Sequence, residues 1–181
     1  AQPAGSPAMD SYYRDQVRWG AIEPTKGSYD FSWFDAGLAD AAAHGGKFGF
    51  RVMAWCPGCW MEWRTDVPHT TPSWVPLQPG TTIPDWNSPA FLQDWEALMT
   101  ELGSRSGNDP RLGFVDVGGY GQYGEWHTDG TGTGATRASI GRLRHAGPDS
   151  FPTPPLTTNA RTHPPTHTAP PPPPRRPAPP D

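Results

Sequence analysis

The sequence has little of what several classes of protein depend on. Only two cysteines occur among 181 residues, which excludes a disulfide-dense small protein. Hydrophobic residues make up 34% of the chain. The chain has no run of about 18 apolar residues, so we expect no membrane-spanning helix and no membrane partner. A net charge of -4 gives no reason to expect a nucleic-acid partner. The composition also excludes a collagen-like repeat and a coiled coil.

The residues that are abundant are distributed unevenly. All nine tryptophans lie between Trp19 and Trp126, whereas 13 of the 25 prolines lie in residues 151–181. An average this poor in apolar residues cannot support one core along the whole length. We therefore expect a lead-in, a folded part and a disordered low-complexity tail, which we place at residues 1–11, 12–130 and 131–181.

The tail has two explanations. It is rich in proline, arginine, threonine and histidine, which is what a wrong reading frame in GC-rich DNA would encode. One hypothesis is that the frame is lost between residues 131 and 150. The alternative is a genuine, extended proline-rich linker. The chain begins without a basic and apolar leader, as expected of a fragment or of a secreted protein whose signal peptide has been removed.

Periodicity predicts alternating strands and helices in the folded part. Strands are expected at residues 13–19, 47–55 and 112–117. One helix is expected to be capped by Ser32 and ended by Gly45, and another to begin at Pro89 and end at Gly103. Residues 56–86 are expected to form a long aromatic loop. This order favours an α/β fold with a parallel sheet, whose functional groups lie past the carboxyl ends of the strands.

Four segments, in the same order, resemble a known family. They are RWGAIEPTKGSYDFSWFD (residues 18–35), FGFRVMAW (48–55), PDWNSPAF (84–91) and DPRLGFVDVGGYGQYGEWH (109–127). Together they are similar to a poorly characterised branch of the β-galactosidase-like clan of (β/α)8 glycoside hydrolases. The resemblance covers residues 12–130. It implies a partial (β/α)8 barrel that acts on glycosidic bonds of a carbohydrate.

The resemblance makes Glu125 the candidate acid/base, because glycoside cleavage needs a carboxyl group that protonates the leaving oxygen. It makes Arg51 a supporting residue that orients the nucleophile, whereas the residues alone are equally compatible with a structural ion pair. Three departures count against activity. Gly124 stands where the clan has asparagine, Glu125 follows the third evident strand instead of the fourth, and no glutamate follows it. This chain is therefore expected to be truncated and inactive.

Aromatic rings stack on the apolar faces of sugars, so aromatic side chains in loops are candidate binding residues. The candidate sugar-binding residues are six aromatic side chains and one neighbouring histidine: Trp55, Trp60, Trp86, Tyr120, Tyr123, Trp126 and His127. Trp33 and Trp95 are instead expected to pack between helix and sheet, and Glu23 is expected to anchor its own loop. The expected partner is a carbohydrate, with no cofactor and no metal. The main alternative is a carbohydrate-binding protein without catalysis.

The two cysteines leave further alternatives open. Cys56 and Cys59 have the spacing of a redox pair, although Pro68 ends any following helix early. With His69 and His127 they could form a zinc site. A structural thiol pair or a local disulfide is the remaining explanation.

Overall fold

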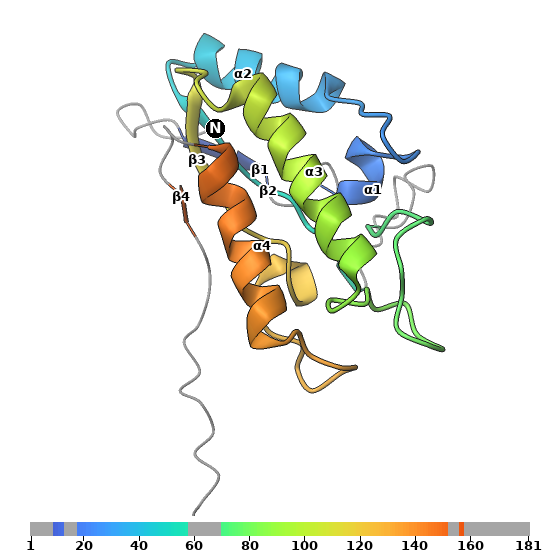
Figure 1. Cartoon of the computed structure of the whole chain (residues 1–181). Helices are drawn as coiled ribbons and strands as arrows, with labels where there is room; N and C mark the ends of the chain where they lie inside the picture. The colour runs from blue at the N-terminus through green and yellow to red at the C-terminus, as the bar shows by residue number, and fades with distance from the viewer. Residues whose placement is uncertain (1–8, 13–17, 58–69, 152–155, 158–181) are drawn as a thin grey trace, which may run out of the picture.

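The computed structural model describes residues 9–12, 18–57, 70–151 and 156–157. Four strands form one sheet in the order β1-β2-β3-β4, and each pairs in parallel with its neighbour (Figure 1). The strands are β1 (Met9–Tyr12), β2 (Lys47–Arg51), β3 (Leu112–Asp116) and β4 (Leu156–Thr157). Because a helix lies between each pair of successive strands, the chain has the predicted α/β fold, a partial (β/α)8 barrel.

The helices cover the sheet. They are α1 (Trp19–Ile22), α2 (Ser32–Ala43), α3 (Pro89–Ser106) and α4 (Arg137–Ser150), with a short 3-10 turn, η2, at Gln122–Gly124. Helices α3 and α4 lie side by side in front of the strands (Figure 1). None of the helices in the described part of the chain is long and apolar enough to cross a membrane.

The first strand lies earlier than the sequence predicted. It starts at Met9, inside the span that we took as a lead-in, and Trp19 begins helix α1 instead of ending a strand. The helical turn is closed by the Trp19 indole, which donates to the carboxylate of Glu23 four residues on, at 2.7 Å. This spacing belongs to a helix, and it overrides the alternation that indicated a strand. Residues 13–17 lie outside the described residues.

The second strand is shorter than predicted, because β2 ends at Arg51. Beyond it, Met53 makes only an isolated parallel bridge to Arg18. The cap predicted for helix α2 is also wrong. Ser32 is its first residue, and the side chain of Asp30 accepts a hydrogen bond from the Ser32 N–H at 2.9 Å. The N-cap position is Phe31, which makes no side-chain cap hydrogen bond, and Asp30 instead satisfies the first free N–H of the helix.

Gly103 does not end helix α3, which continues to Ser106. A Cβ atom at Gly103 would lie 2.1 Å from the carbonyl oxygen of Ser150, at the end of α4. This glycine is therefore a contact point that lets the two helices approach closely. The sequence could not distinguish this use of glycine from a helix stop.

The boundary predicted for the tail is also wrong. Helix α4 and strand β4 both lie within residues 131–181, where disorder was expected. Thr136 caps α4 by accepting a hydrogen bond from the Ser139 N–H, and Leu143 is fully buried. These elements continue the alternation of strand and helix, so the folded part extends beyond residue 130. The proline-rich residues 158–181 lie outside the described residues.

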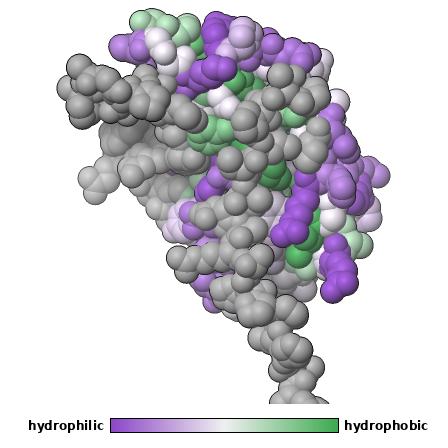
Figure 2. Space-filling model, turned by 90° about the vertical axis from the view of Figure 1, so that its left-hand side faces the viewer, coloured by the Kyte–Doolittle hydropathy of each residue, from purple (hydrophilic) through white to green (hydrophobic). Residues whose placement is uncertain are grey.

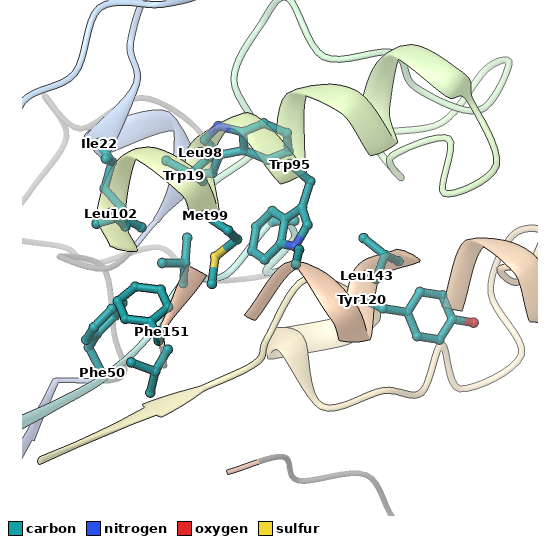
Figure 3. Close-up of a cluster of buried hydrophobic side chains, with 14 of the residues drawn as sticks. Trp19, Ile22, Phe50, Trp95, Leu98, Met99, Leu102, Tyr120, Leu143 and Phe151 are labelled. Atoms are coloured by element: carbon teal, nitrogen blue, oxygen red, sulfur yellow. The ribbon is translucent and has the colours of Figure 1, made fainter. Parts of the chain in front are cut away.

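The hydrophobic core lies between the sheet and the helices. Phe50 from β2, Trp95 from α3 and Leu143 from α4 belong to one buried cluster (Figure 3). Phe34 on α2 contacts the rings of both Phe48 and Phe50 edge to face, with centroids 5.2 and 5.0 Å away. Trp95 is fully buried, and Trp33 is partly buried against this core, as predicted. On the face turned toward the viewer in Figure 2, hydrophobic residues lie near the centre and hydrophilic ones toward the right-hand rim.

Candidate active site

The site is built on a charged pair at the carboxyl ends of two neighbouring strands. Arg51 is the last residue of β2, Asp116 is the last residue of β3, and the two are paired in the sheet. The Nε and Nη2 groups of Arg51 both donate to Oδ2 of Asp116, at 2.9 and 2.5 Å. Both side chains are buried. Hydrogen bonds between charged groups are the strong ones, so this pair holds the guanidinium in one orientation.

The remaining nitrogen of the guanidinium faces the loop that follows β3. Nη1 donates to the carbonyl oxygen of Tyr123 at 3.0 Å and lies 3.5 Å from Oε1 of Glu125. On its other side, Glu125 has Oε2 3.5 Å from Nε2 of His127. Nδ1 of His127 in turn lies 2.9 Å from Oδ1 of Asp129. A row of alternating acids and bases thus runs outward from the buried pair to the surface.

Burial and charge have opposite effects on Asp116. Burial raises the pKa of its carboxyl above the ordinary value, the hydrogen bonds and charge of Arg51 lower it, and the nearby charge of Glu125 raises it again. The net direction is upward, because burial disfavours the ionised carboxyl group more than Arg51 favours it. The guanidinium of Arg51 contacts two carboxyl groups, those of Asp116 and Glu125.

The backbone around Glu125 is strained. In the described residues, a positive φ at a residue other than glycine occurs at Tyr123, Trp126 and Asp129, with values of 55°, 63° and 47°. All three lie within four residues of Glu125. Such conformations cost about 1–3 kcal/mol each and persist where the surroundings impose them, often at functional sites. The loop is closed by the Trp126 N–H, which donates to the carbonyl oxygen of Tyr120 at 3.1 Å.

The structure separates the predicted binding residues into two groups. Trp55, Trp86 and Tyr120 are at most 8% exposed and pack edge to face on one another, so their rings offer no free face to a sugar. They belong to the core cluster, and Trp86 also packs edge to face against Phe91 of α3. Trp60 lies outside the described residues.

Tyr123, Trp126 and His127 remain near Glu125 with accessible surface. Tyr123 is 40% exposed, and its hydroxyl donates to the carbonyl oxygen of Pro57 at 3.0 Å. Trp126 is half-buried, and its indole N–H donates to the carbonyl oxygen of Val117 at 2.7 Å. The guanidinium of Arg144, on α4, lies over its ring at 5.1 Å.

Other candidates have structural surroundings. Glu23 is buried and accepts from the Gly27 N–H at 2.7 Å as well as from Trp19, so it anchors its own loop as predicted. Cys56 is buried and disulfide-bonded, so it is not a free thiolate for a metal. Cys59 and His69 lie outside the described residues. Within the described ranges, no three histidine, cysteine or acidic side chains are arranged to hold a metal ion.

Asp116 was not among the residues predicted from the sequence to form the site. Its partner lies 65 residues away along the chain, and no local pattern joins them. The signal that was available was its position: an acidic residue directly after a buried strand, at the end where the sites of parallel sheets lie.

Comparison with known proteins identifies a family whose model matches more than half of this chain. A family model described as β-galactosidase (glycoside hydrolase 42) matches residues 11–121. The match ends just before Glu125. A curated relative, β-galactosidase BgaH of Haloferax lucentense, is 26% identical over 103 residues, which are 54% of this chain and 15% of that protein.

Two solved structures resemble the fold. Xylanase 10B from Thermotoga maritima aligns with a TM-score of 0.57 and 15% identity, over 83% of this chain and 40% of that one. An intracellular xylanase from Thermoanaerobacterium saccharolyticum, solved with xylotetraose, aligns with a TM-score of 0.50 and 14% identity, over 82% of this chain and 44% of that one. This chain thus spans less than half the length of these relatives.

Proposed function

Because this chain belongs to the β-galactosidase family, glycoside hydrolase 42, we propose that Glu125 is the acid/base of a site that acts on the glycosidic bonds of a β-galactoside-like carbohydrate. The observation that carries the proposal is the environment of Glu125. Its side chain is 37% exposed at the carboxyl end of the sheet, and Arg51 lies on one side of it and His127 on the other. A carboxyl group in this position can reach a ligand while neighbouring groups fix its orientation.

Arg51 supports Glu125 in this proposal. Its hydrogen bonds to Asp116 are those of a structural ion pair, and the same guanidinium also lies beside Glu125. Arg51 can therefore stabilise the sheet and support Glu125 at the same time. Tyr123, Trp126 and His127 are the binding residues that we retain, because they lie in the loop of Glu125 and have accessible surface.

We further propose that residues 1–181 alone bind carbohydrate without hydrolysing it. Hydrolysis needs a second carboxyl group across the scissile bond. Asp116, whose carboxyl group lies close enough to Glu125 to feel its charge, is buried and bonded to Arg51. No glutamate follows Glu125 in the sequence. The exposed ring of Tyr123 supports the binding function.

The test compares the chain with Glu125→Gln, which keeps the shape of the side chain and removes its ionisable proton. Tryptophan fluorescence should report binding of a galactoside by both proteins, and neither should hydrolyse an aryl galactoside. Hydrolysis by the unchanged chain would refute the second proposal, and under the first proposal that hydrolysis should disappear in the variant. Glu101→Gln, at an exposed position on α3, is the matched control and should change neither readout. Hydrolysis that survives Glu125→Gln would refute the acid/base role, and a chain that binds no galactoside would refute the binding function.

A further inference from the structure

We propose that Asp116 is a positioning residue, which fixes the loop of Glu125 by holding Arg51. The inference rests on the proposed role of Glu125, but it concerns a residue that neither the sequence motifs nor the comparisons single out. Asp116 lies behind Arg51 and is 5% exposed, so it acts through the arginine instead of touching a ligand.

The first step is the contact between Asp116 and Arg51. Two nitrogens of the Arg51 guanidinium donate to the same carboxylate oxygen of Asp116, Oδ2. The second oxygen of Asp116, Oδ1, is buried and has no hydrogen-bond partner among the described residues. Gly118 makes room for this arrangement, because a Cβ atom there would lie 2.4 Å from Cγ of Arg51. The backbone thus leaves a channel for the arginine stem. Its guanidinium is fixed on the side of β3.

The second step leads from Arg51 to the loop. With Nε and Nη2 engaged by Asp116, Nη1 is the nitrogen that reaches the Tyr123 carbonyl at 3.0 Å and Glu125 at 3.5 Å. Tyr123 has a φ of 55°, a conformation that its surroundings must impose. Its N–H donates to the carbonyl oxygen of Trp55 at 3.0 Å, so the turn is held from both sides. Glu125 follows two residues later and takes its position from this turn.

The third step is electrostatic. The Arg51 guanidinium contacts both Asp116 and Glu125, and the shorter contact is to Asp116. His127 and Asp129 face Glu125 from its other side. Loss of the charge on Asp116 would leave the guanidinium attracted mainly to Glu125, so it would turn away from its position beneath Tyr123. The raised pKa of Asp116 agrees with a carboxyl group kept buried for this contact.

The experiment is amide hydrogen exchange on the whole chain, with Asp116→Asn as the variant. Asparagine keeps the volume and removes the charge. The amides of Tyr123 and Glu125, which donate to Trp55 and Gln122, should exchange about tenfold faster, the effect expected from losing a charge-assisted hydrogen bond. Amides in the middle of α3 should keep their protection. Asp109→Asn, which removes the partner of Arg111 on the surface, is the matched control and should leave the Glu125 loop unchanged.

Two further variants keep the test decisive. Arg51→Lys keeps the charge but loses the two-nitrogen contact, and should accelerate the same amides; it replaces Asp116→Asn if that protein does not fold. The double variant should be no faster than either single one, because both act through one link. Unchanged exchange at Tyr123 and Glu125, or equal acceleration throughout α3, would overturn the inference. Failure of the proposed function would appear separately, in the binding and hydrolysis of Glu125→Gln.

Discussion

The sharpest test of the fold is the substitution Leu143→Ala in helix α4. Leu143 is fully buried and belongs to the same cluster as Trp95 (Figure 3). Replacing a buried leucine by alanine removes its transfer free energy and leaves a cavity, which costs about 2–5 kcal/mol. Since Leu143 is fully buried where α4 packs along α3, we expect a loss of about 3 kcal/mol. For a domain of about 150 residues, that lowers Tm by roughly 6–12 °C.

Urea unfolding, followed by tryptophan fluorescence, measures this loss directly. His145→Ala is the matched control, because His145 is exposed on the same helix and its replacement should change the free energy of unfolding by less than about 0.5 kcal/mol. If Leu143→Ala were no more destabilising than His145→Ala, helix α4 would not be part of the cooperative fold. The tail would then begin at residue 131, as the composition of the sequence predicts.

Two other predictions follow from local geometry. A Cβ atom at Gly49 would lie 2.1 Å from the ring of Phe114, so Gly49→Ala should lower the free energy of unfolding, measured in urea, by about 1–3 kcal/mol. Adding Phe114→Leu should restore part of this loss, because the smaller side chain relieves the clash. If the second change had no effect on stability, the clash would not be the cause of the loss. Burial, and then the charge of Glu23, raise the pKa of Tyr29 to about 12 from the ordinary 10.0. Because the unfolded tyrosine ionises first, the contribution of Tyr29 to stability is complete below pH 10 and is lost as pH rises through about 12. Tyr29→Phe should remove this loss, and an ultraviolet titration in which every tyrosine ionised near pH 10 would contradict the prediction.

Patterns within one element were enough to predict much of the fold. The helical spacing of Phe91, Trp95, Leu98 and Leu102 predicted α3, and all four are fully buried. The strand expected at residues 47–55, of which 47–51 form β2, and the helix before it were predicted for the same reason. In each case the buried face repeats with the period of the element, and that period is visible in the sequence.

Features that depend on contacts between distant segments could not be predicted. Helix α4 is rich in arginine and glycine, and its few apolar residues are recognisable as a buried face only once α3 is seen to pack against them. The loop tryptophans looked exposed because polar and proline residues surround them, yet Trp86 is covered by Phe91 and Tyr120. Asp116 gains its role from Arg51, which is on another strand. Local composition carries no information about such pairs.

One irregularity of the sheet brings the fold and the site together. Phe48 pairs with Leu112, but Gly49 pairs with Phe114, so the register of β2 and β3 shifts by one residue at this point. Successive residues of a strand face opposite sides of a sheet, and a slip of one residue exchanges those sides. Without the shift, Arg51 would be paired with Val115, whose side chain is fully buried in the core. The shift instead places Asp116 opposite Arg51, two residues beyond the contact between Phe114 and Gly49. The packing that stabilises this pair of strands therefore also sets the ion pair beneath Glu125.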